Sequence, residues 1–365
     1  MSSVLDGFRD PVIAAKLADA IRETATTPCT LMEVCGTHTM AIAKNGLRGL
    51  MPETVKLLSG PGCPVCVTAN PDIDLAIEIA RQPGVVMTTF GDMMKVPGSY
   101  SSLARERAEG HDVRVVYSPL DSLSIAESEP DKHVVFLGVG FETTAPAVAL
   151  TIREAARRRL PNWSALSLHK TVPGALRALV DDPEVKVTGF ILPGHVSTII
   201  GVAPYRFLAE EYGVPSVITG FEPVDVLQGV WMLAKQLAEG RAEVEIAYGR
   251  GVNAEGNPSA IAAIESTFDA CDAEWRGIGV IPGTGLALRP EFVAYDARLR
   301  VPCTPPEPRE IRGCQCGDVL RGVVQPFECK LFGRACVPEH PVGPCMVSSE
   351  GSCAAYYRYT DYGRA

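Results

Sequence analysis

The chain has 365 residues, with 34 Lys and Arg against 43 Asp and Glu, which gives a formal net charge of −9. Hydrophobic residues make up 46% and charged residues 21% of the sequence, a globular composition that argues against disorder. The acidic balance also argues against a broad nucleic-acid surface, because such a surface needs an excess of positive charge. A chain of this length predicts two or three domains with a sizeable core.

Twelve cysteines are the first unusual feature of the sequence. Residues 1–10 lack the basic start and apolar run of a secretory signal, so we expect a cytoplasmic protein. In that compartment, cysteines are more often metal ligands or redox groups than structural disulfides. The uncharged run at residues 187–205 contains Pro193, Gly194 and Pro204, which favours a strand, a turn and a helix start over a membrane span.

Strand and helix patterns alternate along the first two thirds of the chain. A helix is expected at residues 4–24. Short β-branched runs follow, and each ends in a glycine-rich or polar turn. They form two series of four, at residues 30–34, 55–58, 85–89 and 113–117, and at residues 134–137, 166–168, 187–192 and 215–218. Strands that alternate with helices predict βαβ units in largely parallel sheets.

The two series predict an α/β protein with two similar parallel-sheet domains and a C-terminal cysteine-rich region that suits an iron–sulfur centre. A polar segment with a proline, residues 126–132, separates the series, and the strand–helix rhythm weakens beyond residue 239. We therefore expect a first α/β domain at residues 1–128, a second at 129–240 and the C-terminal region at 241–365.

The first candidate site is the motif Cys35-Gly36-Thr37-His38, directly after a predicted strand. Ligands bind at the carboxyl ends of strands in open α/β sheets. A helix that starts here favours the thiolate, which predicts that Cys35 is a better nucleophile or metal ligand than an isolated cysteine. His38 is near enough in sequence to share a metal or a proton with Cys35. The alternative is a small buried cysteine followed by a capping histidine.

The second candidate site is Cys63-Pro64-Val65-Cys66, which follows Gly60-Pro61-Gly62. These glycines and prolines predict a tight turn that presents both thiols. A Cys-x-x-Cys at a strand-to-helix turn suggests a dithiol/disulfide pair. The alternatives are half of a zinc site, with partners from far along the chain, and a purely structural role.

Seven cysteines follow residue 300. Four of them, Cys329, Cys336, Cys345 and Cys353, suit an iron–sulfur cluster or structural zinc. Structural zinc usually shows closer cysteine pairs than these four, which favours a cluster held by separate loops. Alternatively, the Cys314-x-Cys316 pair could supply a ligand in place of one of these four.

Two other polar residues, Glu142 and His195, also lie at predicted strand ends, where we expect each to be a capping or buried polar residue. Neither Gly138-x-Gly140 nor the segment 279–285 completes a nucleotide-binding pattern. The sequence therefore predicts no nucleotide loop.

Taken together, the motifs resemble those of the HypD family of hydrogenase maturation factors. Five blocks match in the family's order, and the resemblance extends from about residue 30 to residue 360. The blocks are residues 33–40, 60–66, 140–146, 192–197 and 343–357.

The resemblance implies a protein that helps to build the iron centre of nickel–iron hydrogenases, in which the iron carries two cyanides and one carbon monoxide. It implies a complex with a HypC-type chaperone, cyanide from a HypE-type protein and an indirect relation to the hydrogenase large subunit. Cys35 and His38 would form the iron-assembly site, and Cys63 and Cys66 a redox pair. A [4Fe-4S] cluster would be held by Cys329, Cys336, Cys345 and Cys353.

Two other functions stay open on the residues alone. An iron–sulfur-dependent thiol–disulfide oxidoreductase explains Cys63, Cys66 and the tail cysteines, but it leaves the Cys35–His38 motif unexplained. A zinc-stabilised interaction module would have no redox role. Neither a nucleic acid nor a membrane is an expected partner.

Overall fold

Two parallel sheets and one antiparallel hairpin make up the β structure of the computed structural model, which describes residues 6–309 and 312–363. The five-stranded sheet has the order β2-β1-β7-β8-β9, and the four-stranded sheet has the order β4-β3-β5-β6. Every strand pair in these two sheets is parallel. The strands are β1 (Cys29–Glu33), β2 (Val55–Ser59), β3 (Val85–Thr89), β4 (Val113–Val115), β5 (His133–Gly138), β6 (Trp163–Ser167), β7 (Gly189–Pro193), β8 (Ser216–Thr219), β9 (Val244–Ile246), β10 (Phe268–Trp275) and β11 (Gly279–Leu288).

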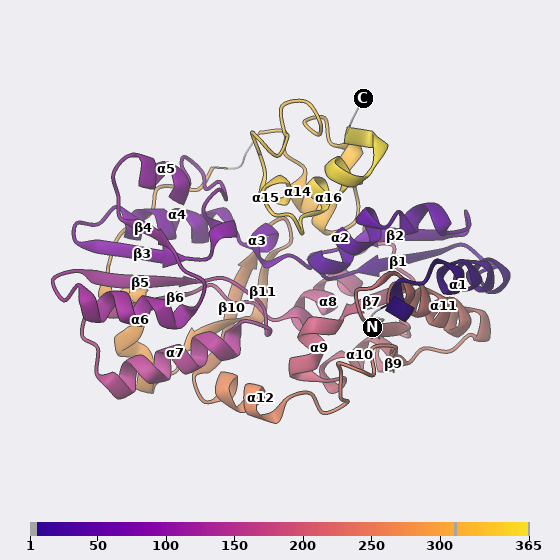
Figure 1. Cartoon of the computed structure of the whole chain (residues 1–365), viewed down its shortest axis with the longest axis horizontal. Helices are drawn as coiled ribbons and strands as arrows, with labels where there is room; N and C mark the ends of the chain where they lie inside the picture. The colour runs from indigo at the N-terminus through magenta and orange to yellow at the C-terminus, as the bar shows by residue number, and fades with distance from the viewer. Residues whose placement is uncertain (1–5, 310–311, 364–365) are drawn as a thin grey trace.

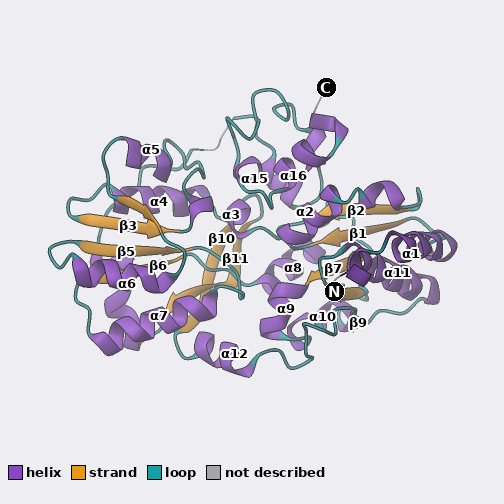
Figure 2. Ribbon diagram, in the orientation of Figure 1, coloured by secondary structure: helices purple, strands orange, loops and turns teal. Residues whose placement is uncertain are grey.

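Helices flank both sheets, so the predicted α/β class with two parallel-sheet units and a cysteine-rich C-terminal region is confirmed (Figure 2). The helices are α1 (Pro11–Thr24), α2 (Gly36–Lys44), α3 (Pro64–Val67), α4 (Asn70–Ala80), α5 (Leu103–Ala108), α6 (Pro119–Ser128), α7 (Ala145–Arg158), α8 (Val172–Asp181), α9 (Gly194–Ile200), α10 (Phe207–Glu210), α11 (Pro223–Glu239), α12 (Pro258–Glu265), α13 (Ala297–Arg300), α14 (Cys316–Leu320), α15 (Pro344–Val347) and α16 (Ser352–Tyr359). None of these described helices combines the length and hydrophobicity that crossing a membrane requires.

The strand pairings divide the chain differently from the predicted boundary at residue 128. β5 and β6 pair with β3 and β4, whereas β7, β8 and β9 join β1 and β2. The chain therefore crosses from the five-stranded to the four-stranded sheet after β2 and returns after β6. The local strand–helix rhythm specifies βαβ units, but it carries no information about pairs such as Leu31 of β1 with Gly189 of β7, which are far apart in the chain.

The hydrophobic core is continuous across the two sheets and the cysteine-rich segment that follows residue 300, here named the tail. One cluster of buried residues includes Met32 of β1, Met87 of β3 and Cys345 of the tail. In addition, α16 packs against α2, and α15 packs against α3. Figure 1 shows the yellow tail lying over the junction between the two sheets. The tail is thus held by both sheets rather than attached at one end.

Short helices begin directly at the ends of the strands that carry the motifs. Cys35 is the N-cap of α2, Cys63 is the N-cap of α3, and Pro193 is the N-cap of α9. Each of these residues has extended backbone geometry, as an N-cap requires. The sharp change from strand to helix leaves these three turns at the carboxyl edge of the five-stranded sheet, where α/β proteins bind ligands.

Candidate functional site

Four strand-end loops and the tail meet around one cavity of about 270 Å³, here named the Cys35 cavity. The loops follow β1, β2, β5 and β7, so both parallel sheets contribute. The lining residues are Val34, Cys35, Thr37, Gly62, Pro64, Phe141, Thr143, Thr144, Pro193, His195, Val196 and Glu350. The motifs that sequence analysis identified separately are therefore parts of one site.

The Cys35 turn and the Cys63 turn are in direct backbone contact. The amide of Gly36 donates a hydrogen bond of 2.9 Å to the carbonyl of Gly62, and the amide of Gly60 donates one of 2.7 Å to the carbonyl of Glu33. A Cβ atom on Gly62 would lie 2.1 Å from the amide nitrogen of Cys35. A glycine at position 62 is therefore required for the approach of the two turns.

The Cys35 thiol is protonated in this environment, contrary to the expectation from the helix N-terminus. Burial raises the pKa of Cys35 to about 12, and the nearby Glu350 carboxylate adds to the increase. Backbone amides of α2 at His38 and Thr37 favour the thiolate, but their effect is smaller. Desolvation outweighs the helix terminus here, because Cys35 is only 8% exposed. A cation bound at the thiol would reverse this balance and favour the thiolate.

His38 lies behind the cavity rather than in its lining. Its Nε2 atom is 2.8 Å from both the hydroxyl of Thr219 and the carbonyl of Gly220, at the end of β8. The Nδ1 atom is buried and has no hydrogen-bond partner among the described residues. Burial lowers the pKa of His38 to about 4, so the ring is neutral.

His195 is the histidine that lines the cavity. Its ring stacks on Phe221 with a centroid distance of 3.9 Å, and the ring of Phe221 also contacts that of His38, with a centroid distance of 4.6 Å. His195 is exposed, whereas His38 is buried. The structure therefore brings Cys35 and His195 to one cavity and connects His38 to it through an aromatic ring.

The tail contributes a carboxylate to this cavity. The hydroxyl of Thr37 donates a hydrogen bond of 2.6 Å to Oε1 of Glu350. A Cβ atom on Gly36 would lie 2.5 Å from Cβ of Glu350, so the tail approaches the start of α2 closely. Glu350 lies in the tail segment between Cys345 and Cys353, and sequence analysis assigned it no role.

Glu142 supports the loop that supplies Phe141, Thr143 and Thr144 to the cavity. Its Oε1 atom accepts a hydrogen bond of 2.9 Å from the amide of Val172. The Oε2 atom is buried without a partner among the described residues, and burial raises the pKa of Glu142 to about 7. This placement confirms the expected buried polar role for Glu142.

Cys63 and Cys66 form a buried thiol pair. Their sulfur atoms lie 2.7 Å apart, and the amide of Cys66 donates a hydrogen bond of 3.3 Å to Sγ of Cys63. Only a small movement would bring the two sulfur atoms to the roughly 2.05 Å of a disulfide. Burial raises the pKa of Cys66, whose thiol also interacts with that of Cys345. The pair thus connects the Cys35 turn to the tail.

The tail cysteines line a second, small cavity of about 20 Å³, here named the thiol chamber. Its lining includes the four predicted ligands and both cysteines whose role the sequence left open: Cys314, Cys316, Cys329, Cys336, Cys345 and Cys353. The remaining lining is mainly apolar, with Val319, Leu331, Phe332 and Met346. The sulfur atoms of Cys316 and Cys345 are 2.6 Å apart.

The donor chemistry of the thiol chamber fits an iron–sulfur cluster. Six cysteine thiols dominate the donor atoms of its lining, and iron–sulfur clusters are held by cysteine thiolates. Within the described part of the chain, no group of three or more His, Cys, Asp or Glu side chains has the geometry of a metal-ion site. The six cysteines of the chamber are two more than the four thiolates that a [4Fe-4S] cluster needs.

Comparison with known proteins gives a consistent family. The family model described as "HypD: Hydrogenase formation hypA family" matches residues 12–360. The chain is 47% identical to the hydrogenase maturation factor HypD of Rhodobacter capsulatus, over 96% of this chain and 97% of that protein. It is 44% identical to HypD of Escherichia coli K12, over 97% of each chain. The chain belongs to the HypD family. Its role is therefore in hydrogenase maturation.

Sequence analysis did not place His195 or Glu350 in this HypD-family site. His195 was expected to be a capping or buried polar residue, which is wrong, because it is exposed and lines the cavity. Glu350 was assigned no role, although it lies between Cys345 and Cys353; the available signal was that both residues lie inside motifs that match the family. Their convergence on Cys35 depends on contacts 160 and 315 residues apart in the chain, which no local pattern specifies.

Substitution of Gly62 tests the contact between the two turns. In Gly62→Ala, the new methyl group collides with backbone at Cys35, so we expect the unfolding free energy to fall by about 2–3 kcal/mol. Gly49→Ala is the matched control, because nothing lies within 4 Å of a Cβ at that position. Chemical denaturation followed by circular dichroism measures both. Equal stability of the two variants would contradict the described contact.

Replacement of Glu142 tests its burial through the pH dependence of stability. The folded-state pKa is raised from 4.5 to about 7, so the folded protein retains a proton that the unfolded chain loses between these pH values. The contribution of Glu142 to the unfolding free energy is fully present below pH 4.5, and the unfolding free energy falls by about 3 kcal/mol as the pH rises to 7. Glu142→Gln should remove the part of the decline that Glu142 causes and leave the part from Glu33, whose pKa burial also raises to about 7. Glu265→Gln, at an exposed end of α12, should leave the whole decline unchanged. An unchanged pH profile in Glu142→Gln would mean that another group causes the decline.

Proposed function

We propose that this chain is the scaffold and redox protein on which the iron of a nickel–iron hydrogenase acquires its two cyanides and one carbon monoxide. The observation that carries this proposal is the continuous contact from the Cys35 cavity, through Cys63 and Cys66, to the thiol chamber. A site that binds iron and a site that stores electrons are thereby joined inside one molecule. We place the process in the cytoplasm, where thiols stay reduced.

Cys35 is the proposed protein ligand of the cargo iron. Iron with cyanide and carbon monoxide prefers a soft thiolate, and Cys35 is the cysteine that lines the open cavity. His195 and Glu350 share this lining and are placed to exchange protons with bound ligands. His38 supports the site from behind by anchoring α2 to the end of β8 and by contacting Phe221.

The remaining iron ligands require partner proteins. Cys35 is one thiolate in a cavity that supplies few other metal donors, and the iron must later leave for the hydrogenase large subunit. A cysteine from a HypC-type chaperone would complete the site and carry the iron away. Cyanide would come from a HypE-type protein, which would need to reach the same cavity.

The contacts among the tail cysteines support a division of labour in the thiol chamber. Cys345 contacts Cys66 and lies 2.6 Å from Cys316, so the Cys63–Cys66 pair is in direct contact with the chamber. The proposed ligands of the [4Fe-4S] cluster are Cys329, Cys336, Cys345 and Cys353, all of which line the chamber. Cys314 and Cys316, which interact with each other, are the additional thiols of the lining. When bound, the cluster would supply one-electron transfer.

Metal analysis of single variants tests the ligand set. Anaerobically purified protein should contain roughly four iron and four sulfide per chain. Cys345→Ser, like Cys336→Ser, should lose most of this iron, whereas Cys314→Ser should retain it. Cys271→Ser, on the hairpin and outside the chamber, is the matched control. Loss of iron in Cys314→Ser with retention in Cys345→Ser would overturn this ligand set, and stoichiometric zinc would overturn the cluster.

Infrared spectroscopy of the anaerobic complex with a HypC-type chaperone tests the iron site. Bands of metal-bound cyanide and carbon monoxide should appear, and Cys35→Ala should abolish them while the chamber iron stays. His38→Ala should weaken the bands, because α2 loses its anchor at Thr219 and Gly220. Cys271→Ala serves again as the control. Unchanged bands in Cys35→Ala would show that another residue holds the iron.

A further inference from the structure

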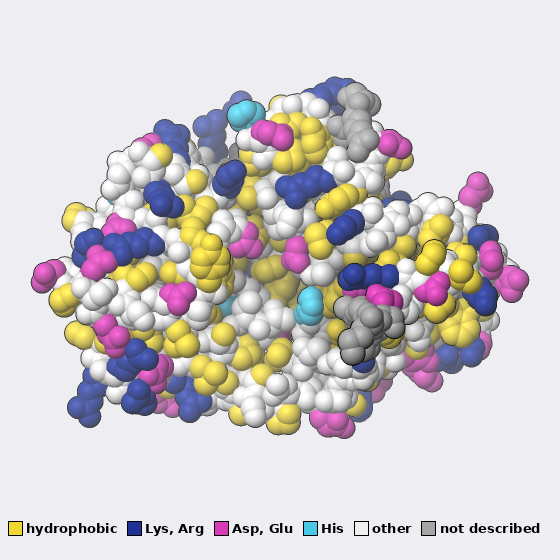
Figure 3. Space-filling view, in the orientation of Figure 1, with side chains coloured by type: hydrophobic (Ala, Val, Ile, Leu, Met, Phe, Trp, Pro, Cys, Tyr) yellow, Lys and Arg dark blue, Asp and Glu magenta, His cyan; other side chains and the backbone are white. Residues whose placement is uncertain are grey.

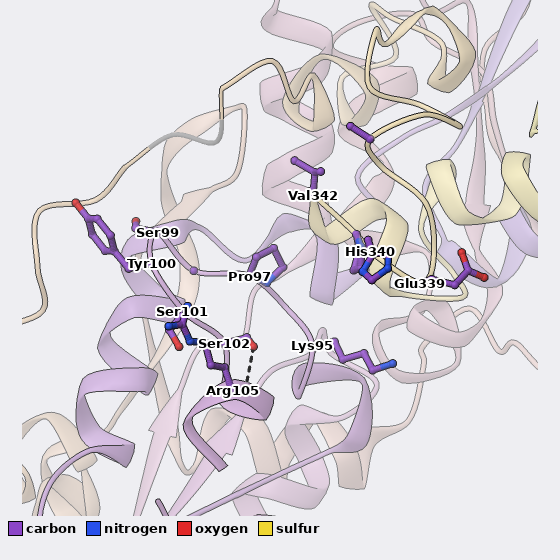
Figure 4. A pocket seen from close by; sticks show the side chains of 13 residues that line it. Lys95, Pro97, Ser99, Tyr100, Ser101, Ser102, Arg105, Glu339, His340 and Val342 are labelled. Carbon is purple, nitrogen blue, oxygen red and sulfur yellow. Dashed lines mark hydrogen bonds between the residues drawn. The ribbon is translucent and has the colours of Figure 1, made fainter. Parts of the chain in front are cut away.

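A groove of about 800 Å³ lies beside the tail loop 335–342, whose neighbouring residues line the thiol chamber. One wall is the segment 95–105, which leads from β3 into α5. The other wall is the tail loop 335–342. Figure 4 shows the two segments facing each other, with Lys95 below Glu339 and His340 of the tail. No residue lines both this groove and the Cys35 cavity.

The tail loop separates this groove from the thiol chamber by a single layer of chain. Ala335 and Val342 line the groove, while their neighbours Cys336 and Gly343 line the chamber. The amide of Val342 donates a hydrogen bond of 3.3 Å to Sγ of Cys336. A molecule seated in the groove therefore contacts the backbone that bonds directly to a chamber sulfur.

The groove is more cationic than the protein that carries it. Lys95 and Arg105 line it together with His340, against one carboxylate, Glu339. Lys95 is exposed and has no ion-pair partner among the described residues, and Arg105 is engaged only by a surface pair with Glu109. The whole chain has a net charge of −9. Figure 3 shows Lys and Arg side chains gathered along the upper edge between the four-stranded lobe and the tail.

The floor of the groove offers apolar contact within this cationic rim. Pro97, Pro341 and Val342 line it, and the Tyr100 side chain is 52% exposed at one end. A small apolar centre with a charged rim is typical of transient electron-transfer complexes, which bury little area and depend on charge for fast encounter.

We propose that this groove docks a small acidic protein that carries single electrons and reduces the thiol chamber. The inference rests on the proposed redox function and names its electron source. Each encounter oxidises the carrier by one electron, and the acceptor would be the cluster that the chamber cysteines are proposed to hold, since thiols accept no electrons. When Cys63 and Cys66 have been oxidised to a disulfide, two electrons from two encounters and two protons from solvent convert it to two thiols. The groove and the Cys35 cavity share no lining residue, so a carrier in the groove contacts a different set of residues from a ligand in the cavity.

Stopped-flow reduction by a reduced plant-type [2Fe–2S] ferredoxin, an acidic carrier, tests the proposal on the intact anaerobic protein. Lys95→Glu with Arg105→Glu should slow reduction at least tenfold at low ionic strength, and the difference should shrink at high salt. Lys16→Glu with Lys56→Glu makes the same charge change on exposed positions near the five-stranded sheet and should slow it far less. An equal effect of both pairs, or no effect of the first, would overturn the docking site.

Two further readouts separate this inference from the proposed function. Dithionite, a small reductant, should reduce wild type and all variants equally. A chain that dithionite cannot reduce would overturn the redox function itself and the docking proposal with it.

Carbodiimide should cross-link ferredoxin carboxylates to Lys95, as mapped by mass spectrometry. Lys95→Arg should lose this cross-link and keep the wild-type rate, because the charge is retained; a cross-link pattern without Lys95 in wild type would contradict the proposed surface.

Discussion

The backbone contact between the Cys35 turn and the Cys63 turn is the constraint on which the arrangement depends. The hydrogen bond between Gly36 and Gly62 requires that both positions lack side chains. A Cβ atom on Gly62 would collide with the backbone of Cys35, and a Cβ atom on Gly36 would collide with Glu350 of the tail. This contact places the Cys35 thiol, which lines an open cavity, next to the turn that holds the buried thiols of Cys63 and Cys66. A disordered or longer connection would separate the two chemistries that the fold brings together.

The position of this contact in the molecule follows from the crossing of the chain between its two sheets. The Cys63–Cys66 turn begins the first crossover, after β2, so it lies where the five-stranded sheet, the four-stranded sheet and the tail meet. α3 packs against α15 there, which places Cys66 beside Cys345. In a chain of two consecutive domains, this turn would lie within one domain and would have no reason to contact the tail.

Much of the local structure was predictable because it is encoded locally. All eight predicted strands form, since each is a short β-branched run that ends in a turn. β10 was not predicted because three of its residues, Asp269, Asp272 and Glu274, are charged and no residue of 269–274 is buried, which is typical of a loop. The pairing of strands and the raised pKa of Cys35 depend on residues far away in sequence, such as Glu350, and could not be read from any one motif.

The closure of the Cys35 cavity by Glu350 has a consequence for how the molecule is completed. The last wall of that cavity comes from the end of the chain, between Cys345 and Cys353, so the cavity is finished only when the tail has folded onto α2. By thermodynamic reciprocity, whatever stabilises the folded tail also strengthens binding in the cavity, and a ligand bound in the cavity stabilises the tail in return. The cavity is therefore complete only in a chain whose tail has already folded onto α2.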